Sequence, residues 1–226
     1  MARRKVKKRL NFLKVIIFLL ILYLLFNVAI KLSGVPIKSI IIKNTSYLTD
    51  TKVIEIAGLE DYPSYFRTST LRREKKLEEY PLIKKADIKR KLNFAIEINV
   101  EEEKILYKKR NDNKYVLGSG KEVSLDNNIS GIATLINYTP NDIQKKFNKK
   151  LNLIDDNILS KISEIEYSPN KTDDERFLLY MNDGNLVYIT ISKIKELNYY
   201  INIVKKLNNK KGILNLDSGN YFEVKE

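Results

Sequence analysis

The sequence predicts an α+β protein with a single N-terminal transmembrane helix. An uncharged apolar run lies near the N-terminus, at Val15–Ile30. After residue 36, short β-branched runs alternate with segments of helical periodicity, which is typical of small α+β domains. The 226 residues leave room for one membrane segment and two such domains.

The apolar run predicts a transmembrane helix over residues 15–33. Val15 to Ile30 would span about 24 Å at a rise of ~1.5 Å per residue, slightly less than a hydrocarbon core of ~30 Å. Phe12, Leu13 and Leu32 can lengthen the run at its two ends. A cleaved signal peptide is the alternative, but the residues that follow form a poor cleavage site, so we expect an uncleaved anchor.

The charge around this segment is asymmetric. Seven cations precede it, namely Arg3, Arg4, Lys5, Lys7, Lys8, Arg9 and Lys14. Without them the chain carries 34 cations and 28 acids, so more than half of the net charge of +13 sits in a short arm. The positive-inside bias predicts that residues 1–14 form a cytoplasmic arm and that the rest lies outside the cytoplasm, in the inner (plasma) membrane and beyond it. A basic arm beside an apolar run favours a membrane over nucleic acid as its partner.

Residues 36–108 predict a first domain of the order strand, helix, helix, strand, strand. Ile37–Lys43 is a β-branched strand, and a helix capped by Thr49 or Asp50 follows and stops at Gly58. Thr68 or Ser69 caps a second helix that ends before Pro81. A strand over residues 82–90, a turn over residues 91–93 and a strand of period two from Phe94 to Glu101 complete the domain.

Residues 109–226 predict a second domain built on a mixed sheet. A hairpin of Tyr115–Leu117 and Glu122–Leu125, a strand at Ile132–Ile136, a helix after Pro140 and a short helix capped by Asp155 or Asp156 come first. Strands at residues 163–167, 176–181 and 186–191 follow, the last two joined by an Asp-Gly turn. A late amphipathic helix starts at Ser192 and is expected to end at Gly212, before strands at Ile213–Leu216 and Tyr221–Val224.

The composition excludes several kinds of active site. The chain has no His and no Cys, so it cannot build a Ser–His–Asp or Cys–His nucleophile, a His/Cys zinc site or a disulfide. The two dense acidic runs, Glu101–Glu103 and Asp173–Glu175, are interpreted as solvated strand ends or loops. We therefore expect no catalytic residue, no metal and no cofactor. A membrane-anchored extracytoplasmic enzyme remains an alternative.

The first domain resembles the POTRA domain of the bacterial division proteins FtsQ/DivIB. The resemblance rests on its βααββ order directly after an anchor and on the stretch from Tyr80 to Glu102, with a Pro, a buried pair, Ala, an apolar-x-Arg step, a turn and an alternating strand. Asn93 stands where that family usually has Pro. The second domain resembles the β-domain of the same family, chiefly at Ile213–Gly219.

The resemblance implies a non-enzymatic, single-pass scaffold of the divisome at the division septum. In the family, the C-terminal strand region of the β-domain is understood to bind an FtsB/DivIC-like partner by strand pairing, which brings an FtsL-like protein with it. The matching positions here are Ser218, Gly219, Asn220, Tyr221, Phe222 and Val224. The alternative for the two aromatic residues is that they close the core of their own sheet.

A POTRA-containing translocation or membrane-assembly factor is a second alternative function. Such a protein would carry repeated POTRA units and a β-barrel tail, which the sequence does not predict. The sequence leaves open the outer compartment, the oligomeric state, and the identity and stoichiometry of partners.

Overall fold

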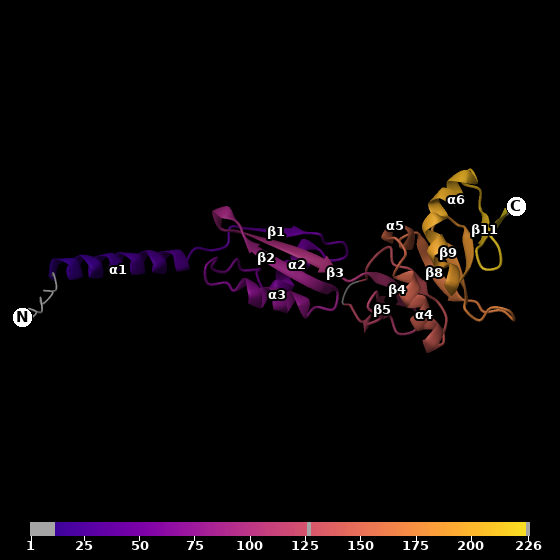
Figure 1. The fold of residues 1–226 in the computed structure, drawn as a ribbon, viewed down its shortest axis with the longest axis horizontal. Coiled ribbons are helices and arrows are strands. Elements are labelled where there is room, and N and C mark those ends of the chain that lie inside the picture. Colours follow the sequence, from indigo (N-terminus) through magenta and orange to yellow (C-terminus); the bar gives the residue numbers. More distant parts are fainter. Residues whose placement is uncertain (1–11, 126–127, 225–226) are drawn as a thin grey trace, which may run out of the picture. The chain divides into compact units, whose positions relative to one another are not determined.

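The computed structural model describes residues 12–125 and 128–224 and divides the chain into two compact units, Met1–Glu102 and Glu103–Glu226. Figure 1 shows the elements along the chain. Most of the expected cytoplasmic arm, residues 1–11, lies outside the described residues. The expected boundary after residue 108 differs from this division, because the strand Ile105–Lys109 pairs within the sheet of the second unit.

Helix α1, Phe12–Ser33, is the apolar segment. It has a mean hydropathy of 2.7, and none of its residues is buried within the structure. At 1.5 Å per residue its 22 residues span about 33 Å, which is enough to cross a hydrocarbon core. Asn27 donates its side-chain amide to the backbone oxygen of Tyr23 at 2.8 Å, so its polar group is satisfied within the helix.

The first unit continues with a βααββ domain. Its elements are β1 (Ser39–Lys43), α2 (Asp50–Ala57), α3 (Thr70–Glu78), β2 (Ile83–Arg90), the 3-10 turn η1 (Leu92–Phe94) and β3 (Ala95–Glu102). The sheet order is β1-β3-β2, with β1 parallel and β2 antiparallel to the central β3. Apolar residues of α2 and α3 pack on the buried positions of β2 and β3 to form one core.

The helix caps of this domain follow the sequence signals. Thr49 caps α2 by accepting a hydrogen bond from the Lys52 amide, and Gly58 ends it in the left-handed conformation. Ser69 caps α3 by accepting from the Arg72 amide. The expected βααββ fold is confirmed.

The second unit is built on a nine-stranded mixed sheet. Its strands are β4 (Ile105–Lys109), β5 (Tyr115–Leu117), β6 (Glu122–Val123), β7 (Thr134–Leu135), β8 (Ile162–Tyr167), β9 (Arg176–Met181), β10 (Leu186–Thr190), β11 (Gly212–Asn215) and β12 (Tyr221–Val224). They lie in the order β12-β11-β10-β9-β8-β7-β4-β5-β6. Alternating burial in β10 shows that one sheet face forms the core.

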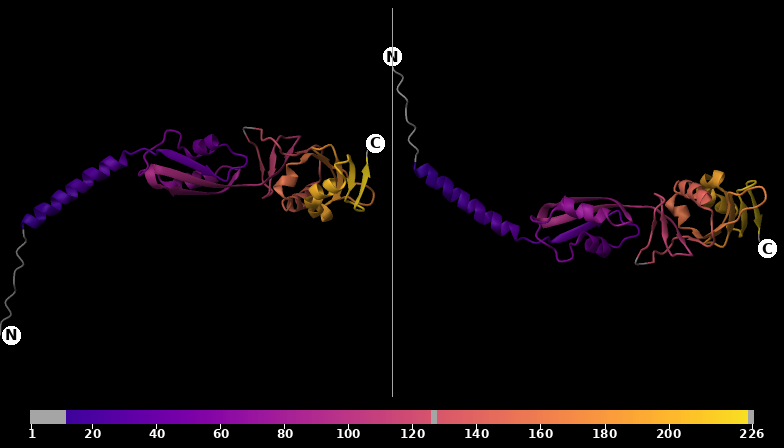
Figure 2. Two further views of the ribbon diagram at one scale, coloured as in Figure 1. Left: turned by 90° about the horizontal axis from the view of Figure 1, so that it is seen from above. Right: turned by 90° about the horizontal axis from the view of Figure 1, so that it is seen from below.

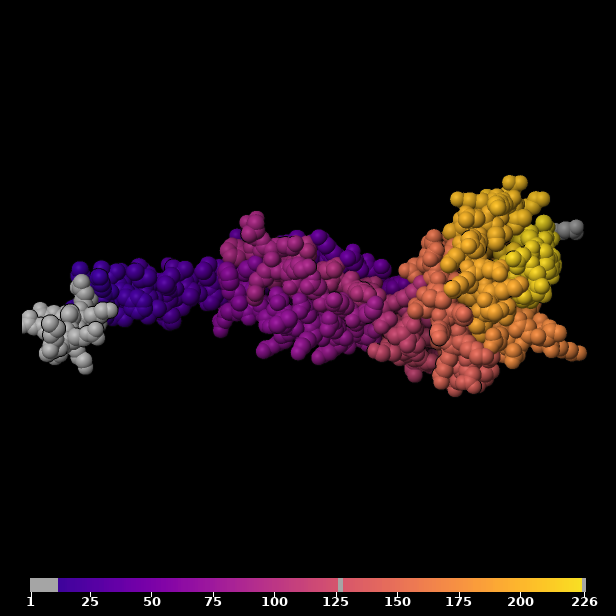
Figure 3. All heavy atoms as spheres, in the orientation of Figure 1, coloured from indigo at the N-terminus to yellow at the C-terminus, as the bar shows by residue number. Residues whose placement is uncertain are grey.

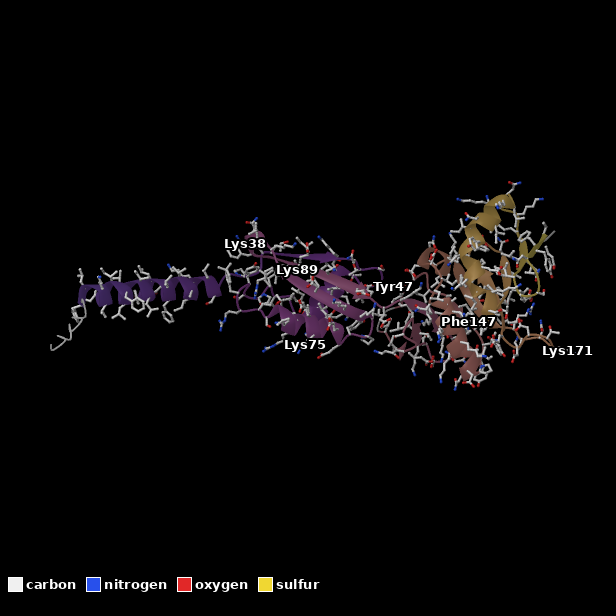
Figure 4. The ribbon with its side chains drawn as sticks, viewed as in Figure 1. Lys38, Tyr47, Lys75, Lys89, Phe147 and Lys171 are labelled. Atoms are coloured by element: carbon white, nitrogen blue, oxygen red, sulfur yellow. The ribbon has the colours of Figure 1, made fainter. Side chains whose placement is uncertain are left out.

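Helices cover that core face, as the two views of Figure 2 show. They are α4 (Asn141–Leu151), α5 (Asp156–Leu159), η2 (Ile191–Tyr199) and α6 (Tyr200–Lys206). Phe147 of α4 stacks on Phe177 of β9 with ring centroids 3.9 Å apart, and both side chains are buried. Figure 4 labels Phe147 in this unit.

The late helix differs from the expected one at both ends. It begins as the 3-10 segment η2, and α6 ends at Lys206, well before Gly212. Asn208 and Asn209 take the left-handed conformation, with φ values of 53° and 55°, and turn the chain. Asn tolerates that conformation better than other non-glycine residues, so no glycine is needed there. Gly212 instead opens β11.

Candidate functional site

The candidate site is the outer edge of β12. This strand stands last in the sheet order, and β11 is its one strand partner among the described residues. The two strands run antiparallel with Gly212 opposite Val224, Leu214 opposite Phe222 and Asn215 opposite Tyr221. The backbone groups on the far side of an edge strand are free to pair with another strand.

Gly212 allows β12 to approach β11 closely. A Cβ placed at this residue would lie 2.0 Å from the backbone oxygen of Glu223 and 2.8 Å from the Phe222 ring. No side chain fits at that distance, so the glycine is required by close backbone approach and not by helix termination.

A polar network centred on the buried side chains of Asn185 and Tyr200 fixes the start of β11. The Gly212 amide donates to Asn185 Oδ1 at 2.9 Å, and Asn185 Nδ2 donates to the Tyr200 hydroxyl at 3.0 Å. The hydroxyl in turn donates to the Asp183 carboxylate. Burial raises the pKa of Tyr200 well above its usual range, so the hydroxyl keeps its proton. The network therefore ties β11 to the β9–β10 turn and to α6.

A buried ion pair holds the bend between β11 and β12. Arg176 Nε donates to Asp217 Oδ2 at 2.6 Å, and the guanidinium lies 3.7 Å from the centroid of the Tyr188 ring. The two charged side chains are 16% and 9% exposed. Burial by itself would raise the pKa of Asp217, but the hydrogen bonds from Arg176 and Ser218 outweigh it and hold that pKa below its usual range.

The two aromatic residues of β12 have different environments. Phe222 is partly buried and packs against the core of the second unit. Tyr221 is 49% exposed and Val224 is 54% exposed. The alternative that both aromatic side chains close the core therefore holds for Phe222 and not for Tyr221, and the interface at β12 stays a prediction. Among the other expected positions, Ser218 and Asn220 are exposed and Gly219 is half-buried.

A groove of about 340 Å³ adjoins the first residues of β12. Ile203 and Leu207 line it from the late helix, Leu214 and Leu216 from β11 and the residue after it, and Tyr221 and Phe222 from β12. In Figure 3 the yellow atoms of the C-terminal strands lie beside the golden atoms of the late helix. An apolar side chain from an added strand could lodge here, next to the open edge.

Sequence reasoning missed the groove and Arg176. Periodicity predicts that the late helix is amphipathic, but it identifies an apolar face and not how much of that face the fold covers. Arg176 was interpreted only as the first residue of a strand. Nothing local pairs it with Asp217, which lies 41 positions away.

The acidic runs serve the fold. Glu102 accepts hydrogen bonds from the amides of Ser46, Tyr47 and Leu48 at 2.7–2.9 Å, which closes the loop after β1. In the second run, Asp173 accepts from the Glu175 amide at 2.8 Å. Glu102 is therefore not the solvated strand end that the sequence suggested. Within residues 12–125 and 128–224, no group of three or more His, Cys, Asp or Glu is placed to hold a metal ion.

Two family descriptions match most of the chain. "POTRA domain, FtsQ-type" matches residues 35–103, and "Cell division protein FtsQ/DivIB, C-terminal" matches residues 105–221.

Curated relatives are similar over most of their length. Cell division protein DivIB of Bacillus subtilis (strain 168) is 29% identical over 98% of this chain and 85% of the relative. DivIB of Bacillus cytotoxicus is 30% identical over 92% of this chain and 83% of the relative. DivIB of Listeria monocytogenes is 30% identical over 81% of this chain and 71% of the relative.

A solved structure shows a partial likeness. It is the major extracytoplasmic domain of the trans isomer of the bacterial cell division protein DivIB from Geobacillus stearothermophilus, with 23% sequence identity and a TM-score of 0.40. The match covers 48% of this chain and 96% of that chain.

Proposed function

Because the chain belongs to the FtsQ/DivIB family of bacterial cell-division proteins, we propose that it is a single-pass scaffold of the divisome. It recruits FtsB/DivIC-like and FtsL-like partners to the division septum for cell-wall assembly. Helix α1 anchors it with the N-terminus in the cytoplasm, and the two folded domains lie outside. The role is positional and uses no catalytic group.

The observation that carries this proposal is the open edge of β12. An incoming strand would pair with its free backbone groups and extend the nine-stranded sheet by one strand. Backbone pairing supplies affinity, whereas the exposed Tyr221 and Val224 and the adjoining groove supply specificity. Ser218, Gly219 and Asn220 set the bend that leads into the edge, and Phe222 anchors it to the core.

The alternative of a translocation factor has less support. Residues 105–221 match the C-terminal family of FtsQ/DivIB and not a second POTRA unit. A chain of that alternative kind would repeat the first domain.

The experiment compares the full chain with a chain that ends at Leu216. Both are expressed in membranes with the FtsB/DivIC-like and FtsL-like proteins of the same organism, solubilised in detergent and captured. We expect the shortened chain to release both partners while its first domain and β4–β11 stay protected from hydrogen exchange. Unchanged recovery of the partners by the shortened chain would reject the proposal.

Cysteine pairing tests the strand register directly. The chain has no Cys, so single variants at Tyr221, Glu223 and Val224 give unambiguous disulfides with single cysteines scanned along the partner. Strand pairing brings only directly opposed residues within the Cα distance of about 5.5 Å that a disulfide needs. We expect each position to link to one partner residue, in a register that runs in step along both strands.

A further inference from the structure

The turn between β2 and β3 presents an apolar side chain to solvent. Leu92 is 90% exposed, the largest exposure among the apolar side chains of the folded domains that the structure describes. Two residues further along the chain, Phe94 is half-buried, and its ring lies in edge contact with Phe66, with centroids 6.1 Å apart. Phe66 is itself 46% exposed. Exposed apolar residues that gather in one place indicate a contact surface.

This turn is well held. The Lys91 amide donates to the Ala95 oxygen at 2.8 Å, and the Tyr65 hydroxyl donates to the Lys91 oxygen at 2.8 Å. Asn93 and Phe94 both take the left-handed conformation, with φ values of 59°. For Phe that conformation is rare and costs energy. The structure therefore keeps Leu92 at a defined position outside the core.

The turn lies close in space to the segment that follows α1. The Tyr65 amide donates to the oxygen of Val35, two residues after α1, at 2.9 Å. The Tyr65 ring contacts Phe94 and Phe66, with centroids 5.6 Å and 5.1 Å apart. Figure 4 shows Lys38 and Tyr47 at opposite ends of this domain, and the Lys38 amide donates to the Phe94 oxygen at 3.0 Å. If α1 spans a bilayer, this end of the domain stays within a few residues' reach of the lipid surface.

Two lysines, Lys38 and Lys91, flank the apolar side chains. Lys38 Nζ lies 5.3 Å from the centroid of the Phe94 ring, and the Lys91 side chain is 45% exposed. Lys91 also pairs with Glu97, which offsets part of this charge. Leu and Phe flanked by Lys match a membrane interface, where apolar groups enter the acyl boundary and cations meet anionic headgroups.

We propose that this tip, defined as Lys38, Phe66, Lys91, Leu92 and Phe94, rests on the lipid surface of the membrane that holds α1. Leu92 inserts between headgroups, and the two lysines lie over anionic lipid. The occupant is lipid because the anchor keeps this surface at high effective concentration beside the tip, whether or not a partner is bound. The contact sets how the first domain stands on the membrane and does not depend on the edge of β12.

Lipid quenching in the full chain tests the contact. The chain has no Cys, so Lys91→Cys and Ser46→Cys each carry one environment-sensitive fluorophore. Ser46 lies at the other end of the domain, where its amide is bonded to Glu102 at 2.9 Å. Each labelled chain is reconstituted without partners in vesicles of phosphatidylglycerol and phosphatidylcholine that contain lipid with a nitroxide near the headgroup.

We expect the fluorophore at position 91 to be quenched several-fold more than the fluorophore at position 46. Adding Leu92→Asp to the Lys91→Cys chain should reduce quenching to the level of position 46, whereas the matched change Leu153→Asp, at an exposed Leu of the second unit, should leave it unchanged. Replacing phosphatidylglycerol by phosphatidylcholine should weaken the quenching. Equal quenching at the two positions would overturn the proposal. So would a shielded fluorophore at position 91 that lipid does not quench and that depends on protein density, because a second copy would then be the occupant.

Discussion

The edge strands β2 and β12 differ in whether their outer backbone groups have hydrogen-bond partners. In the first domain, α3 covers the outer edge of β2, where the Ile88 amide donates to Glu74 at 2.8 Å and the Ala86 amide to Glu78 at 3.2 Å. In the second domain, β12 ends the described sheet with no element across it. Helix coverage is one of the ways in which proteins prevent unwanted strand pairing.

This difference indicates which sheet edge can pair with a strand of another protein. Two carboxylates on one face of α3, four residues apart, satisfy an edge that would otherwise attract another strand. At β12 the contacts hold the strand in place and leave its outer edge open. They are the close approach at Gly212, the Asn185–Tyr200–Asp183 network and the Arg176–Asp217 pair. A strand held so firmly by its inner side while its outer side stays open fits a recruitment site.

The largest effect is expected from a substitution that displaces β12 and so removes the open edge. Gly212→Val should force β12 away from β11, because the new side chain would meet the Glu223 backbone, which can clear it only if β12 itself moves. We expect binding of the FtsB/DivIC-like partner to fall at least ~100-fold, about 2.7 kcal/mol, and residues 221–224 to lose protection from hydrogen exchange. Gly34→Ala is the control, since its Cβ would meet only the Lys31 oxygen at 3.7 Å. Full binding by the Gly212 variant would contradict the role of β12.

The ion pair behind the bend should make the edge sensitive to acid. The folded pKa of Asp217 is lowered, so its contribution to stability is complete above the ordinary value of 3.8 and is lost as pH falls from there through the folded pKa. Asp217→Asn should remove that dependence and cost about 2 kcal/mol at neutral pH, because Arg176 stays buried without its charge partner. Urea unfolding at several pH values measures both. Parallel pH profiles for the variant and the parent chain would rule the explanation out.

Uncovering β2 should have a smaller effect. Glu74→Ala should cost about 1 kcal/mol in the unfolding of the first domain, and Glu78→Ala somewhat less because its bond is longer, since each leaves a partly buried amide without its partner. Glu79→Ala, at an exposed residue just after the same helix, is the control and should change stability little. The double variant should also self-associate more strongly in sedimentation, because its edge is now open. A monomeric double variant of unchanged stability would show that α3 does not protect the edge.

The smallest change in stability is expected at Tyr221, and it should distinguish the role of this residue from that of Phe222. Tyr221→Ala should alter folding stability by less than about 0.5 kcal/mol and weaken partner binding ~10-fold, because its side chain is half exposed. Phe222→Ala should lower folding stability more than it weakens partner binding, since its ring packs on the core. Calorimetry and binding of both variants decide the assignment. Equal behaviour of the two variants would mean that the strand acts as a backbone template alone.

Local chemistry was sufficient for much of the architecture. The uncharged run fixes α1, since hydropathy needs no tertiary information. Thr49 and Gly58 bracket α2 as their types require, and period-two alternation places Ile96, Ile98 and Val100 in the core. The β9–β10 hairpin is located by Asp183 and Gly184, where Gly184 takes a positive φ of 87° and turns the chain.

Long-range placement decided the site. Sequence located the final strand and its two aromatic residues but could not say which of them faces the core, because that depends on how β12 is seated on β11. Gly212 carries two meanings in sequence, a helix end or a close approach, and only the backbone of Glu223 beside it selects the second. The pairing of Arg176 with Asp217 and the coverage of β2 by Glu74 and Glu78 likewise arise when distant segments meet. Periodicity and turn chemistry are properties of neighbouring residues, whereas an edge is open or covered only through what the rest of the fold places beside it.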